Sequence, residues 1–193
     1  MWAIGASASA QQSVTVTGQK NASPWIKAES QHFVMYSNAG NDNARALLDN
    51  LEKLDHVLRL YTSDYLIAAA PRQKMTLYYH DGIGGFNDAV AGAPQEAAGL
   101  YNSCGHGVQG YAVNLEPIVE MKPEQLAKQP LNRSQSYIFE AYARHFLYRY
   151  TDIRTPVAYV DGYAQYFSTV RFAGTQVSLG RVPASVARQR RRR

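Results

Sequence analysis

An aromatic and aliphatic stretch at residues 137–167 constrains the fold of this chain more than any other part of its sequence. Apolar residues recur there every three or four positions, the spacing that gives a helix one buried face. After a break, Thr155 can cap a second helix and Pro156 suits its first turn. The pattern predicts two consecutive helices, over 137–150 and 156–170. Their buried faces consist of Ile138, Phe139, Tyr142, Ala143, Phe146, Leu147 and Tyr150, and of Val157, Val160, Ala164 and Phe167.

Three ionisable residues of these two helices are expected to meet. Glu140 and Arg144 are four residues apart, so both side chains leave the same face of the first helix. Asp161, on the second helix, can reach the same point. Two acidic side chains and one basic side chain are therefore predicted to converge between the helices.

Residues 161–169, DGYAQYFST, resemble a helix of the gluzincin zinc metallopeptidases (clan MA) of exported bacterial proteins. In that family a glutamate ligand stands in a Glu-Gly-x-Ala-(Glu or Gln)-Tyr-Phe context, and Asp161 differs from it by one methylene. The family's preceding helix carries His-Glu-x-x-His, whose two ligand positions fall on Glu140 and Arg144 and whose general-base position falls on Ala141. The resemblance covers most of residues 25–180. It implies a zincin-like α+β fold, a zinc cofactor and peptide hydrolysis.

The residues at these positions argue against catalysis. Zinc needs deprotonated donors at about 2.0 to 2.2 Å, whereas an arginine stays protonated. Hydrolysis also needs a carboxylate that takes the proton of the metal-bound water, and Ala141 has none. We therefore predict a non-catalytic domain with no cofactor, which holds a peptide or partner protein in the groove of the family.

A guanidinium can bridge two carboxylates, so Arg144 is predicted to form an ion-pair triad with Glu140 and Asp161 in place of the metal. The simpler interpretation is a surface pair between Glu140 and Arg144 alone. A rival hypothesis is an active zinc peptidase that uses Glu140, Asp161 and a displaced His145. A further alternative is a structural or interaction domain without a groove function.

The rest of the chain predicts one α+β domain over residues 25–180, a small mixed sheet packed on helices. Its strands are predicted from an apolar run and from alternation of apolar and polar residues, and its long helix from leucines at helical spacing. The expected strands are 33–36, 74–80, 98–102, 110–115 and 175–179, and the expected long helix is 42–62. The family resemblance would place the sheet edge that pairs with substrate near 110–115.

Two further groups of residues invite a functional interpretation without supporting one. The glycines of Asp81–Gly85 lack the spacing of a nucleotide-binding loop and are explained by a turn. Cys104 and His106 could be a nucleophile and its base, or metal ligands together with His80 and His145, but nothing in the sequence fixes their geometry. Cys104 is the only cysteine, so no intrachain disulfide forms.

Both ends of the sequence differ in composition from the domain between them. Residues 1–11 carry an Ala-x-Ala pattern typical of a signal-peptide remnant, which predicts an exported or periplasmic protein. Residues 12–24 are expected to form an irregular lead-in. Residues 181–193 form an arginine-rich tail, expected to be disordered and to bind anions non-specifically rather than to recognise nucleic acid. No apolar run is long enough to predict a membrane span.

Overall fold

A computed structural model describes residues 15–18, 25–67, 74–89, 99–104, 107–126, 130–153 and 156–180. These residues form a mixed sheet covered by helices, as predicted for an α+β protein. In chain order the elements are β1 (Thr15–Gly18), β2 (Ile26–Glu29), β3 (Phe33–Ser37), α1 (Asn41–Tyr61), η1 (Ser63–Tyr65), β4 (Met75–His80), α2 (Ile83–Ala89), β5 (Gly99–Cys104), β6 (Gly107–Val113), η2 (Pro123–Gln125), α3 (Arg133–Tyr150), α4 (Val157–Phe167), β7 (Arg171–Ala173) and β8 (Gln176–Ser178).

The main sheet has a parallel centre and antiparallel flanks. Its strand order is β1-β2-β3-β4-β6-β5, in which β3, β4 and β6 are parallel and every other pair is antiparallel. The long helix α1 makes the crossover that a parallel β3–β4 pair requires. Because β6 is paired on both sides, the expectation of a sheet edge near 110–115 is wrong. The edge strand on this side of the sheet is β5, which forms an antiparallel hairpin with β6, and β1 is the edge strand on the other side.

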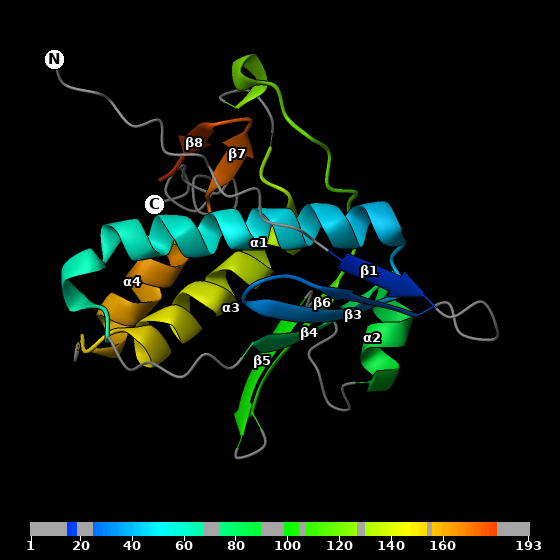
Figure 1. Ribbon diagram of the computed structural model, residues 1–193, viewed down its shortest axis with the longest axis horizontal. Coiled ribbons are helices and arrows are strands. Elements are labelled where there is room, and N and C mark those ends of the chain that lie inside the picture. The colour runs from blue at the N-terminus through cyan, green and yellow to red at the C-terminus, as the bar shows by residue number, and fades with distance from the viewer. Residues whose placement is uncertain are drawn as a thin grey trace, which may run out of the picture.

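Helices α1 and α3 lie on one face of this sheet, and α4 packs on α3 (Figure 1). The alternation of the strands explains which face the helices cover. In β3, Phe33 and Met35 point into the core, whereas Tyr36 points outward and stacks on Tyr78 of β4. On β6, Gly110 leaves room for the core side chains of β4, because an added Cβ would lie 2.6 Å from Leu77 Cδ2.

Several segments form regular structure where none was expected, including β2, β7 and the two segments described next. The lead-in at residues 12–24 contains β1, which pairs with β2 through backbone hydrogen bonds that leave little trace in side-chain pattern. The glycine-rich segment at 81–85 was expected to form a turn, but its last three residues are the first three residues of α2. Phe86 is fully buried and stacks edge-on against His80, which anchors this short helix.

The three long helices follow their predicted positions with shifted ends. Helix α3 begins at Arg133, before the expected residue 137, because the Asn132 side chain caps it by accepting a hydrogen bond from the Gln135 backbone N–H at 3.0 Å. Helix α4 ends at Phe167 rather than 170. The predicted cap Thr155 lies outside the described residues, as do residues 1–11 and 181–193.

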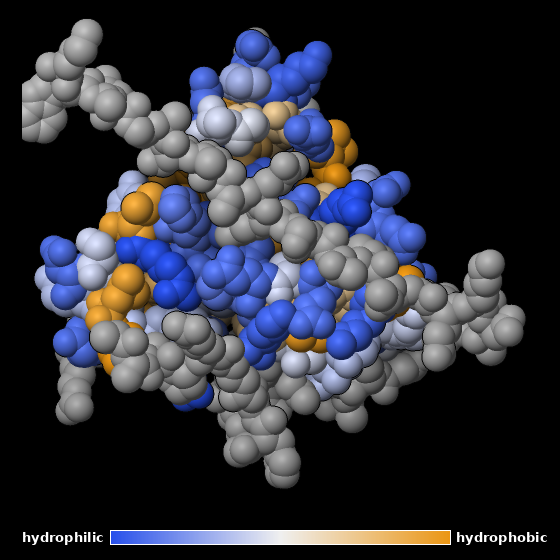
Figure 2. All heavy atoms as spheres, viewed as in Figure 1, coloured by the Kyte–Doolittle hydropathy of each residue, from blue (hydrophilic) through white to orange (hydrophobic). Residues whose placement is uncertain are grey.

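The molecular surface over α1 is mainly hydrophilic, with small separate apolar areas (Figure 2). This agrees with the amphipathic pattern of α1, whose leucines face the core. Among the described residues, no helix has both the length and the apolar character needed to cross a membrane.

Candidate functional site

The structure brings Glu140, Arg144 and Asp161 together at the α3–α4 interface. Arg144 Nη2 lies 2.8 Å from Glu140 Oε1 and 3.0 Å from Asp161 Oδ1. Arg144 Nε donates a second hydrogen bond to Asp161 Oδ1 at 3.2 Å. One guanidinium thus links two carboxylates that belong to different helices.

This triad is partly exposed to solvent. The exposed fractions of the side chains are 34% for Arg144, 27% for Glu140 and 47% for Asp161. Water therefore screens the charges, and the ion pairs belong to the weak class of surface salt bridges rather than to the buried class.

His145 does not join this group, although it directly follows Arg144. Its side chain is 4% exposed, and its ring lies among aromatic rings, 5.6 Å from that of Tyr150 and 6.1 Å from that of Tyr142. Burial, and to a smaller extent the charge of Arg149, lowers the pKa of His145 to about 4. A ligand set made of Glu140, Asp161 and His145 is therefore not formed. No cluster of acidic, histidine and cysteine side chains in the described part of the chain could hold a metal ion.

A second polar network fixes α3 against α1 behind the triad. The Tyr142 hydroxyl donates to Asp55 Oδ1 at 2.6 Å, and Asp55 also accepts from Arg59 Nε at 2.6 Å. Arg59 lies over the rings of Phe146 and Tyr150. Burial is the main cause that raises the pKa of Tyr142, with the Asp55 charge second, so its hydroxyl stays a donor.

The same network continues to the turn between β2 and β3. Glu52, buried on α1, accepts hydrogen bonds from the His32 backbone N–H at 2.8 Å and from its ring Nδ1 at 2.6 Å. Burial alone would raise the pKa of the Glu52 carboxyl, but the interactions of Glu52 with His32 and Ser30 together outweigh burial and lower this pKa. Sequence reasoning missed the two buried carboxylates of α1, Glu52 and Asp55, because they interrupt a leucine face whose spacing is that of an ordinary amphipathic helix.

Aromatic side chains flank the triad on the outer side of α3. Tyr137 is 42% exposed and Tyr148 is 66% exposed, and they lie seven residues before and four residues after Arg144. These spacings place both tyrosines on the helix face that carries Arg144. Helix α3 also packs against the edge strand β5. The outer face of α3 therefore combines charges and aromatic surface, on a helix that also contacts β5.

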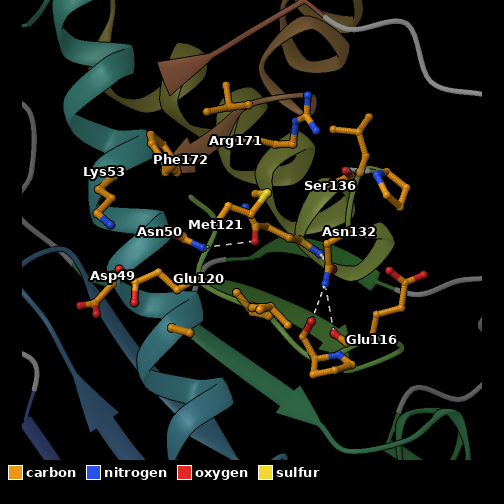
Figure 3. A pocket seen from close by; sticks show the side chains of 18 of the residues that line it. Asp49, Asn50, Lys53, Glu116, Glu120, Met121, Asn132, Ser136, Arg171 and Phe172 are labelled. Carbon is orange, nitrogen blue, oxygen red and sulfur yellow. Dashed lines mark hydrogen bonds between the residues drawn. The ribbon is translucent and has the colours of Figure 1, made fainter. Parts of the chain in front are cut away.

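A cavity of about 290 Å³ lies at the beginning of α3 (Figure 3). Asn50 and Lys53 of α1, the extended segment 116–121, and Phe172 of β7 form three of its sides, and α3 forms the fourth. Ser136 lines it one helical turn before Glu140. The helix that carries the triad therefore also lines part of this cavity.

The cavity walls carry mixed charges. Burial raises the pKa of Asp49, while Lys53 and Arg45 act in the opposite direction. The Lys53 ammonium lies 5.9 Å from the centre of the Phe172 ring. Asn50 Nδ2 donates to Gln135 Oε1 at 3.3 Å, which ties α1 to α3 across the cavity. No pattern in the sequence indicates this cavity, because its lining comes from four separate segments.

The remaining predicted residues are not assembled into a site. His80 is buried at the end of β4, beside Trp25 and Phe86. His106, and the side chain of Cys104 in β5, lie outside the part of the structure that is described.

Comparison of the chain with protein-family models, with curated proteins and with solved structures finds no match. The geometry of the chain's own residues therefore carries the functional argument.

Proposed function

We propose that this chain is a non-catalytic domain of the gluzincin metallopeptidase type, which binds a peptide or partner protein on the outer face of α3 and α4. The position of the Arg144 guanidinium carries the proposal. It lies between Glu140 and Asp161, at the point where the family resemblance would place a zinc ion. A fixed cation at this point repels a dication and occupies one oxygen of each carboxylate.

The rest of the site is consistent with loss of hydrolysis. Ala141 cannot act as a general base, and His145 is held in the core. The order of elements also supports the family interpretation, because an antiparallel hairpin, β5–β6, precedes α3, and α4 follows it. A domain that keeps the family's arrangement of helices and strands but has lost hydrolysis is expected to retain binding of a peptide or partner protein.

The binding mode that we propose is addition of an extended segment to the edge of β5, next to the outer face of α3. An edge strand offers unpaired backbone groups to an incoming strand. Tyr137 and Tyr148 supply exposed aromatic surface, the kind of side chain that carries much of the binding free energy at protein interfaces.

Zinc content tests the loss of the metal site. The chain is purified without metal, supplied with zinc, separated from the excess and analysed for zinc by elemental analysis. We expect a zinc content far below one ion per chain and no hydrolysis of a denatured protein substrate. One tightly held zinc per chain would favour the active-peptidase hypothesis instead.

Reconstruction of the family ligands tests the alignment of the two helices. The fourfold variant Glu140→His, Ala141→Glu, Arg144→His and Asp161→Glu is expected to bind zinc, because it supplies three donors and removes the fixed cation. None of the four single variants should do so. A fourfold variant that folds, as judged by circular dichroism, yet binds no zinc would show that the alignment is wrong.

Peptide binding is tested by selection from a displayed library of random extended peptides, followed by fluorescence polarisation. Tyr137→Ala and Tyr148→Ala should each weaken the selected peptides about fivefold or more. Tyr36→Ala, on the opposite side of the sheet, is the matched control and should leave affinity unchanged. N-methylation of alternate peptide amides should abolish binding if the segment adds to β5. Binding that is insensitive to both tyrosines and to N-methylation would refute this mode.

A further inference from the structure

The ring of His80 is enclosed, and no described residue forms a hydrogen bond with it. His80 is the last residue of β4 and is 3% exposed, and within the described part of the chain neither Nδ1 nor Nε2 has a hydrogen-bonding partner. Buried polar atoms in folded proteins are almost always paired, so an enclosed imidazole of this kind calls for a physical explanation. An unpaired neutral imidazole is tolerated at a cost, whereas an unpaired imidazolium is far more costly.

Two segments close over this ring, one distant in the sequence and one that directly follows β4. The Trp25 ring, just before β2, meets it edge-on with centroids 5.0 Å apart. The Phe86 ring of α2 meets it edge-on at 6.2 Å. A Cβ atom added at Gly85 would lie 3.3 Å from His80 Nδ1, so the backbone of α2 also approaches the ring closely. His80 is therefore the point on β4 against which α2 packs.

The charges around His80 are few. Asp81, the next residue in the chain, favours the protonated ring, and burial disfavours it more strongly, so the pKa of His80 is lowered. From the other elements, the described neighbours are uncharged: Trp25, Gly85 and Phe86 touch or face the ring, and Val113 is its register partner on β6.

We propose that His80 is a pH-sensitive latch that holds α2 and Trp25 on the end of the sheet while its ring is neutral, and releases them when the ring is protonated. The closed arrangement offers an imidazolium no acceptor for its two N–H groups. Movement of α2 away from β4 would let water reach both nitrogens. The helix is suited to local release, since it has only seven residues and includes two glycines.

The direction of the pH dependence follows from linkage. A released His80 titrates near its ordinary pKa of 6.5, whereas the enclosed ring titrates lower. The closed state is therefore fully favoured above that pH and loses its advantage as the pH falls below it. Each pH unit between the two pKa values shifts the closed–open equilibrium by about tenfold.

Hydrogen exchange of the α2 amides tests the latch. Exchange is followed by mass spectrometry at pH 7.5 and pH 5 and corrected for the intrinsic pH dependence of exchange. We expect protection of residues 83–89 to fall at the lower pH, while protection of α1 stays unchanged. In His80→Phe, which keeps an aromatic ring but cannot be protonated, protection of 83–89 should not depend on pH. Equal pH dependence in the wild type and in His80→Phe would overturn the proposal.

Two further measurements remain decisive if His80→Phe does not fold. The first follows the His80 ring by NMR, and we expect its titration to coincide with the loss of α2 protection. The second uses Asp81→Asn, which keeps an oxygen acceptor for Asn38 but removes the charge, and should move the release of α2 to lower pH. A ring that titrates while α2 stays protected would refute the latch. Simultaneous loss of protection in α1 and α2 would also refute it, because that is global unfolding.

Discussion

At the residue scale, the exposure of Arg144 decides how much the triad stabilises the fold. A buried guanidinium between two carboxylates would cost several kcal/mol to remove, whereas a partly exposed one costs far less. Spacing within a helix predicted that Glu140 and Arg144 would share a face. Spacing could not predict the exposure, since this depends on how α4 covers α3.

Replacement of Arg144 by alanine should therefore lower the free energy of unfolding by only about 1 kcal/mol. The loss should shrink at high salt, because the ion pairs are screened. Urea unfolding at low and high salt measures both effects. Arg133→Ala, an exposed arginine on the same helix, serves as control and should change stability by less than about 0.5 kcal/mol. A loss of several kcal/mol would mean that the triad is buried in solution.

His145 should make the protein less stable in acid. Its pKa is about 4 in the folded chain and 6.5 in the absence of structure, so the unfolded chain binds the proton more strongly. The stability that its neutral ring contributes is complete above pH 6.5 and is lost as the pH falls towards 4, by up to about 3 kcal/mol. Urea unfolding between pH 7.5 and 4.5 measures this slope. His145→Phe should flatten the slope, and an unchanged slope would assign the acid sensitivity elsewhere.

At the element scale, the pairing of α1 with α3 depends on a buried polar contact as well as on apolar packing. Helical periodicity predicted both helices and most of their buried residues. It could not predict that Asp55 and Tyr142, 87 positions apart, share a hydrogen bond. Local sequence patterns likewise could not predict that β5 lies at a sheet edge or that β1 exists, because strand order is set by pairing between distant segments.

Removal of the Tyr142 hydroxyl should weaken this pairing. Tyr142→Phe keeps the ring in the core and deletes the hydrogen bond to the Asp55 carboxylate, for an expected loss of about 2 kcal/mol in the free energy of unfolding. Tyr148→Phe, on the exposed face of α3, is the matched control and should change stability by less than about 0.5 kcal/mol. A double-mutant cycle with Asp55→Asn isolates the coupling. If the two changes prove additive, the contact does not stabilise the fold.

At the scale of the whole molecule, charge is distributed unevenly along the chain. The formal net charge is +5, which equals the number of arginines among residues 188–193, so the rest of the chain is formally neutral. The basic character therefore resides in a short segment rather than in a surface of the domain. This pattern predicts non-specific anion binding by the tail rather than recognition of nucleic acid by the domain.

Replacement of the five arginines of residues 188–193 by glutamine should abolish retention on a cation-exchange matrix at pH 7 and low salt. The unmodified chain should be retained and should elute early in a salt gradient, since exposed charges are readily screened. Circular dichroism of the variant should match that of the unmodified chain. Strong retention of the variant would indicate a basic surface on the domain itself.

The sequence by itself determined the long helices, most of their buried faces, and the formally neutral body with its basic tail. The exception on the buried faces is Val157, which was expected to be buried in α4 but is 68% exposed. These features depend on residue type and on spacing along one segment, and side chains one helical turn apart are neighbours in any fold. Only the tertiary structure decided that Asp161 reaches Arg144, that this contact is partly exposed, that β5 is the edge strand and that His80 is enclosed. Each of these depends on the distance between segments far apart in the chain, which is set by the packing of the whole core.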